Sequence, residues 1–327
     1  MKFAKLGFTD IDVSRLSVGC MSFGESDSFH SEWTLPYEES EKLVKRALEH
    51  GINFFDTANI YAEGTSEEIL GRAIKNNIAR DKVVLASKVY FNQGQMTTNS
   101  GNLSKEAILR EIDGTLERLG TDYLDLYIIH RFDQSTPIEE TMEALDSLVK
   151  AGKVRALGAS AMYGYQFHNM QNVAEVNGWT KFASMQNHYN LLYREDEREM
   201  IPICDQFGVS LTPYSPLAGG RLSRPEWHAD TARSKTDQTA KMKYDSTEED
   251  DKKVVARVIE LAEKHNATMT QIALAWHFAK GVTSPIIGAT KAKYFDDAVG
   301  ALDIQLTADE VAYLEELYVP HKIVGAI

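Results

Sequence analysis

Short apolar runs alternate with amphipathic stretches along most of this chain of 327 residues. The apolar runs are rich in Val, Ile, Leu and Phe and do not alternate strictly with polar residues, which is typical of strands buried on both faces of a parallel sheet. The stretches between them repeat apolar residues at helical spacing. Eight strand–helix units follow, with strand segments at 15–24, 52–58, 82–90, 123–131, 154–160, 182–190, 209–220 and 283–290.

Eight such units within this length predict a (β/α)₈ (TIM) barrel, an α/β fold, as one domain over residues 1–327. The segment 2–16 carries a glycine between two short β-prone pieces and predicts an N-terminal β-hairpin at the barrel floor. Residues 307–318 predict an extra C-terminal helix. A doubly wound sheet is the alternative, but no G-x-G-x-x-G follows the first strand.

Charge and composition exclude several classes of partner. The net charge is −13 and the pI is near 5.2, which disfavours nucleic acid and anionic membranes as ligands. No apolar run is long enough to span a bilayer, and the N-terminal residues do not resemble a signal peptide. Cys20 and Cys204 form no C-x-x-C motif. We therefore expect reduced thiols and a cytoplasmic protein, with a monomer as the default state.

Three adjacent predicted strands end in groups that can do chemistry. Asp56 ends the second strand, Lys88 the third and His130 the fourth, and Tyr61 follows Asp56 by five residues. Each has a structural explanation when taken alone: a helix cap, a surface lysine, a satisfied buried histidine, a packing tyrosine. In a barrel, however, the carboxyl ends of the strands meet on one rim, where active sites form. Their coincidence there predicts one site.

Reduction of a carbonyl group by hydride transfer fits this set of side chains. The carbonyl oxygen gains negative charge as hydride arrives, so it needs a proton donor and charge stabilisation. The phenol of Tyr61 is a weak acid, and we expect the ammonium of Lys88 to lower its pKa. Asp56 would hold Lys88, and His130 would orient the carbonyl or share the proton. This explains why an apolar strand stops at an acid.

The chain resembles the aldo-keto reductase family over nearly its whole length, in motifs that are specific in combination. They are GINFFDTANIY, ASKVY, DLYIIHR, VRALGAS, SMQNHYN, TPYSPLAGG and IIGATK. The resemblance implies a catalytic tetrad of Asp56, Tyr61, Lys88 and His130, with Tyr61 as general acid. It is closest in kind to bacterial-type members, with similarity to those that act as potassium-channel β subunits.

The resemblance also implies a nicotinamide cofactor, NADP(H) in preference to NAD(H). Ser160 and Gln186 match the residues that hold the carboxamide, and Tyr214 matches the aromatic that stacks on the ring. Ala161 stands where an asparagine is usual, and Tyr294 and Ala298 replace residues common at the adenine. The full set of implied cofactor contacts is Gly19, Met21, Ser160, Gln186, Tyr214, Ser215, Leu217, Gly219, Arg221, Gly288, Thr290, Lys291, Tyr294 and Asp297.

Two segments favour phosphate binding. Residues 221–243 hold six basic and three acidic residues, a local excess of positive charge in an acidic chain, although such runs are often simply solvated. Residues 288–291 precede the last barrel helix, and a helix N-terminus favours phosphate. By resemblance, this second segment holds the 2′-phosphate of NADPH.

An aromatic rim near the tetrad predicts the substrate pocket: Phe23, Trp33, Tyr90, Phe91, Arg131 and Phe132. Arg131 could meet a phosphate or carboxylate on the substrate, or it could make a structural ion pair. The expected substrate is an aldehyde, a ketone or an open-chain sugar, including a sugar phosphate.

Three other functions compete with this interpretation. A class I aldolase would use Lys88 as the Schiff-base lysine. A metallohydrolase is disfavoured because no H-x-H or HExxH motif is present. The third is an NADPH-binding regulatory subunit with little turnover, against which the intact tetrad argues.

Overall fold

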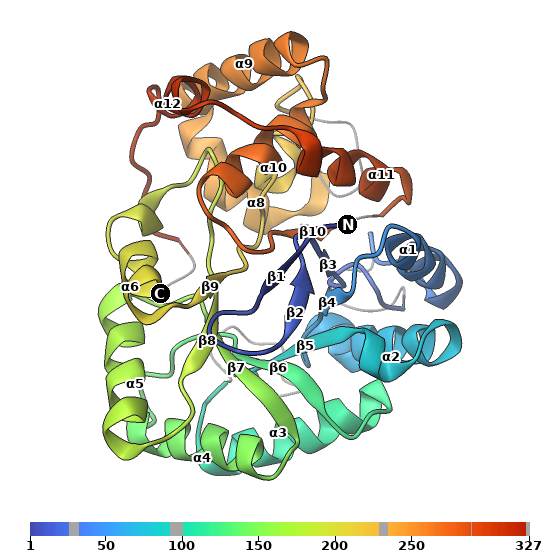
Figure 1. The fold of residues 1–327 in the computed structure, drawn as a ribbon, viewed down its shortest axis with the longest axis vertical. Helices are drawn as coiled ribbons and strands as arrows, with labels where there is room; N and C mark the ends of the chain where they lie inside the picture. Colours follow the sequence, from blue (N-terminus) through green and yellow to red (C-terminus); the bar gives the residue numbers. More distant parts are fainter. Residues whose placement is uncertain (26–32, 92–100, 229–234, 289, 325–327) are drawn as a thin grey trace.

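The computed structural model describes residues 1–25, 33–91, 101–228, 235–288 and 290–324. Eight parallel strands form one sheet in the order β10-β3-β4-β5-β6-β7-β8-β9 (Figure 1). Their bounds are β3 Ser17–Gly19, β4 Phe54–Asp56, β5 Val84–Val89, β6 Leu124–Ile129, β7 Val154–Ser160, β8 Phe182–Gln186, β9 Ser210–Leu211 and β10 Ile286–Gly288. Hydrogen bonds join the two edges, from Ile286 N–H to Pro213 O (2.9 Å) and from Thr283 N–H to Leu211 O (3.0 Å). The closed ring confirms the predicted barrel and excludes the open doubly wound sheet.

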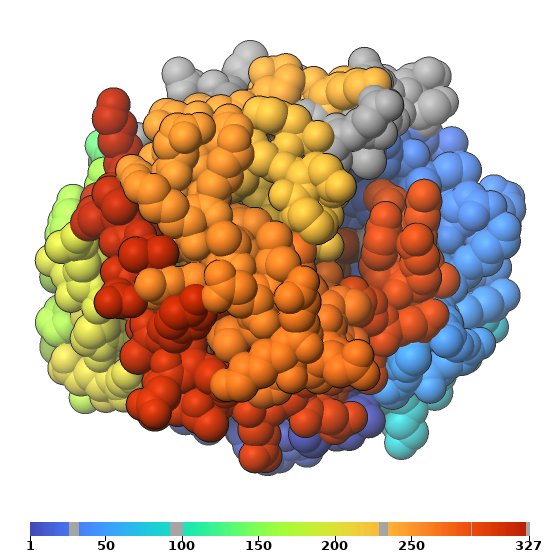
Figure 2. All heavy atoms as spheres, turned by 90° about the horizontal axis from the view of Figure 1, so that it is seen from above, coloured from blue at the N-terminus to red at the C-terminus, as the bar shows by residue number. Residues whose placement is uncertain are grey.

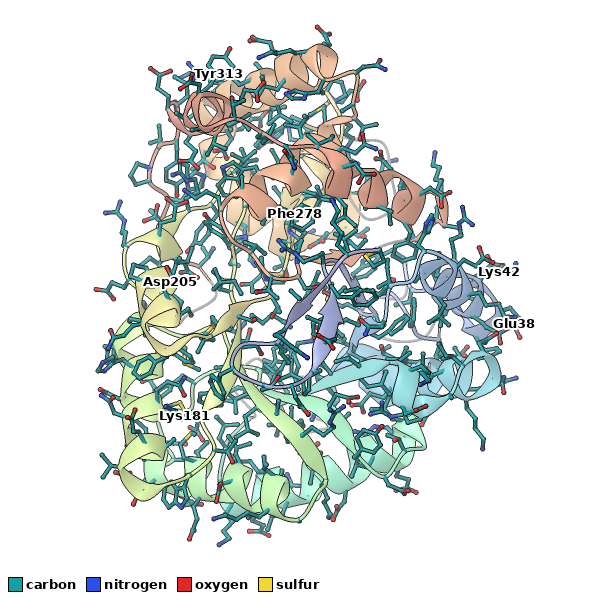
Figure 3. The ribbon with its side chains drawn as sticks, in the orientation of Figure 1. Glu38, Lys42, Lys181, Asp205, Phe278 and Tyr313 are labelled. Carbon is teal, nitrogen blue, oxygen red and sulfur yellow. The ribbon has the colours of Figure 1, made fainter. Side chains whose placement is uncertain are left out.

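Helices cover the outer face of this ring (Figure 1). Their bounds are α1 Tyr37–Glu49, α2 Thr65–Asn77, α3 Lys105–Leu119, α4 Ile138–Lys150, α5 Gly164–Asn177, α6 Met200–Phe207, α8 Gln238–Tyr244, α9 Glu248–Lys264, α10 Met269–Ala279, α11 Lys293–Gly300 and α12 Ala308–Glu315. In α1, Leu43, Val44 and Ala47 are buried. The charged side chains of Glu38 and Lys42 lie on the outer side of the same helix (Figure 3). Helical periodicity therefore decides which face meets the sheet.

The predicted N-terminal hairpin is present and closes the amino-terminal end of the barrel. It pairs β1 (Phe3–Lys5) with β2 (Asp12–Ser14) in antiparallel register. Leu6, Ile11 and Val13 share one buried cluster with interior residues of the barrel strands: Phe54, Val84, Ala86, Leu126, Ile128, Ala156 and Ala183. Gly7 has φ +56°, and a methyl group there would lie 2.3 Å from the Ala183 carbonyl oxygen. The hairpin thus fills one end and leaves the other for a site.

The predicted C-terminal helix is also present, as α12. Arg257 of α9 lies 4.2 Å from the Tyr313 ring centroid of α12, and Trp276 of α10 donates a hydrogen bond to Glu315 (2.8 Å). The helices from α9 onward, in orange and red, cover much of the face seen in Figure 2. Within the described ranges, none of the helices has the length and apolarity needed to cross a lipid bilayer.

A buried ion pair ties α2, α3 and β5 together. Glu67 of α2 is fully buried and accepts a hydrogen bond from Ser87 of β5. Arg118 of α3 donates to its other carboxylate oxygen at 2.7 Å. A buried carboxylate is tolerated only when such donors replace its water. This pair therefore holds the outer helices in register with the strand that carries Lys88.

Replacing Arg118 by Met should lower the free energy of unfolding by about 3–5 kcal/mol, because the Glu67 carboxylate would stay buried without its cation. Urea unfolding followed by circular dichroism measures the loss. In the double variant Glu67→Gln/Arg118→Met, part of the loss should be recovered because no buried charge remains. An Arg118→Met midpoint equal to that of the wild type would contradict this role.

Candidate active site

The strand ends bring together the four residues predicted to form the tetrad. Asp56 is the last residue of β4, and Lys88 is the last but one of β5. His130 directly follows β6, and Tyr61 opens the short 3₁₀ helix Tyr61–Gly64. All four come from the carboxyl-terminal side of neighbouring parallel strands, opposite the hairpin. The site is therefore a direct product of strand order.

Lys88 is the centre of this group. Its side chain is fully buried, and its ammonium donates to Asp56 Oδ1 (2.6 Å), to the Thr57 carbonyl oxygen (2.7 Å) and to the Tyr61 hydroxyl oxygen (3.1 Å). Three acceptors satisfy the three protons of an ammonium. The geometry fixes the distance between the acid and the phenol, because both are bonded to one nitrogen.

The electrostatics keep Lys88 charged. Burial opposes its charge, but the Asp56 carboxylate and then the Tyr61 phenol outweigh burial and raise the pKa of Lys88 above its ordinary value. A charged ammonium beside Tyr61 stabilises a phenolate, as the sequence suggested. The net pKa of Tyr61 is nevertheless raised, because burial of the phenol outweighs the opposing effect of Lys88. Lys88 thus acts on the pKa of Tyr61 in the expected direction, but burial of the phenol determines the net shift.

His130 is held as a neutral imidazole. Burial, followed by the positive charges of Lys88 and Arg131, lowers its pKa well below the ordinary value. Its ring lies 5.9 Å from that of Tyr61, edge to face. Its Nδ1 is buried without a hydrogen-bond partner in the described part of the chain. A neutral imidazole can donate one N–H to a carbonyl oxygen without adding a charge.

A left-handed turn fixes the position of Tyr61. The three residues after it all have positive φ: Ala62 (47°), Glu63 (56°) and Gly64 (93°). Ala62 packs so close to Gly24 that a methyl group on Gly24 would lie 2.4 Å from its Cβ. Left-handed non-glycine residues cost about 1–2 kcal/mol each, so the surrounding packing must hold this turn. The strain lies directly beside the phenol.

The residues expected to hold a carboxamide are joined to the tetrad. Ser160, at the end of β7, donates to the Gln186 carbonyl oxygen (2.7 Å). The Gln186 side chain donates to Asp56 Oδ2 (2.9 Å), so both oxygens of Asp56 are in use. Ala161, which stands where the resemblance implies an asparagine, has φ 44°, a left-handed conformation. The link between Gln186 and Asp56 was not apparent in the sequence.

Tyr214, the expected stacking residue, contacts two other groups. Its ring stacks on His188 at 5.2 Å, and His188 in turn stacks on Tyr193 at 4.1 Å. The Lys243 ammonium lies 4.5 Å from the centroid of the Tyr214 ring. A planar ligand stacked on Tyr214 would therefore meet Lys243, a residue that the sequence did not single out.

The predicted diphosphate loop has a backbone suited to close approach by an anion. Ser215, Ala218, Gly219 and Gly220 have φ of 54°, 49°, 64° and 96°, beside Leu217. Successive left-handed turns of this kind turn backbone N–H groups toward one concave side. A methyl group at Gly220 would lie 2.7 Å from the guanidinium of Arg224. The φ of 96° at Gly220 favours glycine at this position.

Two arginines of this loop differ in their partners. Arg221, expected at the cofactor, is buried and forms an ion pair with Asp245 (2.7 Å), which gives it a structural partner. Arg224 was not predicted individually. Its Nε is buried without a partner, and no acid in the described part of the chain forms an ion pair with it. Burial, then Arg221, lowers its pKa, while Tyr294 and Glu226 act in the other direction. Arg224 is therefore the better candidate for a phosphate.

The remaining expected cofactor residues lie along β3, β10 and α11. Gly19 ends β3 beside Gly288 of β10, and Met21 follows it. Thr290 and Lys291 precede α11, and Lys291 is exposed. Tyr294 is exposed on α11, whereas the Asp297 carboxylate accepts a hydrogen bond from Thr268 (2.7 Å), the N-cap residue of α10. Ala289, residues 92–100 of the loop after Phe91 and residues 229–234 of the basic insertion lie outside the described residues.

The expected substrate rim is placed only in part beside the tetrad. The Phe91 ring lies 5.2 Å from His130 and 5.0 Å from Tyr90, and the Arg131 guanidinium lies 5.8 Å from Phe91. Phe23 and Trp33 are buried, and Phe132 is partly buried against the core. Phe91 is thus the member in direct ring contact with the tetrad, with Tyr90 and Arg131 beside it.

A cavity of about 220 Å³ opens beside Tyr214 rather than over the tetrad. It is lined by residues that include Ala161, Asn187, Asp196 and Val324, and by none of the four tetrad residues. Burial raises the pKa of Asp196 to about 6, with Asn187 opposing this shift. The cavity adjoins the expected carboxamide position. In the described part of the chain, no cluster of His, Cys, Asp and Glu is suited to a metal ion.

We expect the His130 ring to stay neutral as the pH falls through the ordinary histidine pKa, because burial and two cations hold its pKa below that value. Nitrogen-15 NMR of histidine-labelled protein would report the ring state, with His130→Gln assigning the signal. An imidazolium signal appearing near the ordinary pKa would overturn this assignment.

Comparison with known proteins agrees with this geometry. The Aldo/keto reductase family model matches residues 15–319. An aldo-keto reductase of Fusarium vanettenii is 43% identical, over 99% of this chain and 92% of its own length. Versiconal hemiacetal acetate reductase of Aspergillus parasiticus is 42% identical, over 99% of this chain and 98% of its own. A Schizosaccharomyces pombe protein carrying the name of an aryl-alcohol dehydrogenase is also 42% identical, over 98% and 97%.

These relatives are fungal and are named as reductases or dehydrogenases. They give no support to the expected bacterial-type subtype or to the likeness to channel subunits. The match over nearly the whole length, together with the closed barrel, establishes the family to which the chain belongs. The chain belongs to the aldo/keto reductase family.

Proposed function

We propose that this protein reduces an aldehyde or ketone to the alcohol with NADPH. The observation that carries the proposal is the buried Lys88 ammonium, bonded at once to Asp56 and to the Tyr61 hydroxyl beside a neutral His130. Carbonyl reduction needs a proton donor with charge stabilisation next to it. The names of the Aspergillus and Schizosaccharomyces relatives, a reductase and a dehydrogenase, support the same reaction class in its two directions.

In the proposed mechanism, Tyr61 gives its proton to the carbonyl oxygen, and Lys88 stabilises the phenolate left behind. His130 donates an N–H to the same oxygen and so orients the carbonyl. Asp56 keeps Lys88 charged and in place throughout. The nicotinamide, when bound, supplies hydride to the carbonyl carbon. Afterwards Tyr61 recovers a proton, which its raised pKa favours.

The residues present fit a nicotinamide dinucleotide. Gln186, Ser160 and Tyr214 would hold the nicotinamide, and the left-handed loop at Ser215–Gly220 would approach the diphosphate. Arg224, which lacks an acidic partner among the described residues, and the exposed Lys291 would meet the phosphate that distinguishes NADPH from NADH. Tyr294 of α11 acts on the pKa of Arg224, so the two segments lie within electrostatic range of each other, which supports NADPH over NADH.

The charge of Lys88 argues against the aldolase alternative. A Schiff-base lysine must lose its proton to attack a carbonyl, and such lysines have a lowered pKa. The pKa of Lys88 is raised, and all its protons are donated to protein acceptors.

The described cysteines, Cys20 and Cys204, are buried and unpaired. They support a reducing compartment, which we infer to be the cytoplasm.

Tyr61→Phe should lower kcat for carbonyl reduction by at least about 100-fold, the size expected for loss of a general acid, while NADPH still binds. NADPH oxidation with a panel of aromatic aldehydes, diketones and sugar phosphates gives the rate, and quenching of tryptophan fluorescence gives the Kd of NADPH. Tyr165→Phe, at an exposed tyrosine of α5, is the matched control.

The outcomes separate the proposal from its rivals. A variant that loses NADPH binding together with turnover would show a structural role for Tyr61. A wild type that binds NADPH and reduces nothing in the panel would favour the regulatory subunit instead.

Arg224→Leu should raise KM for NADPH about tenfold or more and change KM for NADH by less than about twofold, because only NADPH carries the 2′-phosphate. Steady-state kinetics with both cofactors measure this. Arg72→Leu, at an arginine that lies over Tyr37 on the outer helices, serves as control. Equal increases in KM for NADPH and for NADH would indicate that Arg224 binds the diphosphate instead.

A further inference from the structure

Lys243 is placed in the candidate site by a firmly anchored helix. It is the residue before Tyr244 at the end of α8, and Tyr244 is fully buried. The Tyr244 hydroxyl is bonded to His188 Nε2 (2.7 Å) and to Asn190 (3.0 Å). With its neighbour fixed in this way, the Lys243 ammonium lies over the Tyr214 ring, 4.5 Å from its centroid and 3.4 Å from its hydroxyl oxygen.

The charge of Lys243 is poorly compensated. In the described part of the chain no acid forms an ion pair with it, and its hydrogen bond goes to a phenol. Burial, then the charge of Arg131, lowers the pKa of Lys243 to about 8, and Asp237 opposes this only in part. An ammonium that has lost water without gaining a carboxylate is a ready partner for an anionic ligand.

Arg131 lies near enough to Lys243 for its charge to lower the pKa of the Lys243 ammonium. A series of ring contacts leads to it from the reacting phenol, from Tyr61 to His130 (5.9 Å), from His130 to Phe91 (5.2 Å) and from Phe91 to the guanidinium (5.8 Å). The positive charge of Arg131 also acts on the pKa values of both His130 and Tyr214. It therefore lies within electrostatic range of the tetrad, of Tyr214 and of Lys243.

We propose that Arg131 and Lys243 together bind an anionic group, a carboxylate or a phosphate, on the carbonyl substrate. The proposal rests on the proposed reductase function and names the class of its substrate. The carbonyl would lie at Tyr61 and His130, and the anion would lie between the two cations, over the aromatic wall. A flat, conjugated aldehyde with an acid at its far end fits this arrangement, because Phe91 supplies aromatic surface beside His130.

Cofactor phosphates are the main competing anions. The loop with left-handed glycines and Arg224 is a separate element with its own cation. Lys243 lies instead over Tyr214, the ring expected beside the nicotinamide, which carries no phosphate. The arrangement therefore favours the substrate as the source of the anion.

The test compares two aldehydes with NADPH at about pH 7, terephthalaldehydic acid, which is ionised at that pH, and its neutral methyl ester. We expect the wild type to prefer the acid. Lys243→Met and Arg131→Met should each lower the ratio of kcat/KM for acid over ester about 10- to 100-fold, the loss expected for one hydrogen bond to a charged group. Lys243→Arg should keep most of the preference. Lys241→Met, two residues earlier on α8, is the matched control and should leave the ratio unchanged.

A second pair, glyceraldehyde phosphate and glyceraldehyde, distinguishes phosphate from carboxylate as the preferred anion. Calorimetric titration of the enzyme–NADP⁺ complex with terephthalaldehydic acid tests the anion site without turnover. Tighter binding of the acid than of the ester, lost in Lys243→Met, supports the site even if the reductase function fails.

Three results would overturn the proposal. The first is a wild type that, in both kinetics and calorimetry, shows no preference for either anion over its neutral partner. The second is an equal loss with acid and ester in Lys243→Met, which would indicate a general structural role. The third is a higher Kd for NADPH in Lys243→Met with an unchanged ratio of kcat/KM for acid over ester. That result would assign Lys243 to the cofactor.

Discussion

The site depends on keeping one ammonium charged where water cannot reach it. Lys88 is fully buried, and a lysine in such a position would ordinarily lose its proton. The Asp56 carboxylate and two further oxygen acceptors reverse that tendency. Everything else in the site is arranged around this charge. It stabilises a phenolate on one side, and it helps to keep His130 neutral on the other.

Ring closure is what makes this arrangement rigid. The acid and the lysine stand on paired strands, β4 and β5, and the histidine follows the next strand. Because these strands share one sheet that closes on itself, their ends have little freedom to separate. The hairpin fills the opposite end of the barrel with apolar side chains, and the Glu67–Arg118 pair holds the outer helices. The strained turn after Tyr61 can persist on such a frame.

The barrel and the tetrad could be predicted from the sequence because both follow from local pattern. The order of strands and helices determines which residues meet at one rim, so Asp56, Lys88 and His130 needed no knowledge of distances. The partners of long insertions could not be found in this way. Lys243 and Arg224 lie in a segment whose path over the barrel depends on anchors such as Tyr244. The ion pair of Arg221 with Asp245 is a contact that the periodicity of the sequence does not predict.

The pKa of Tyr61 shows a second limit, because its sign depends on a competition between burial and a nearby charge. A sequence can name the neighbouring ammonium, but only the folded chain shows how much water the phenol loses.

The hydrogen bond from Gln186 to Asp56 has a consequence of another kind. A ligand amide that engages Gln186 competes for the hydrogen bond that this side chain gives to Asp56. The acid would then share more of its charge with Lys88, so binding of the ligand would be communicated from Gln186 to Tyr61 through three hydrogen bonds, without any movement of the backbone.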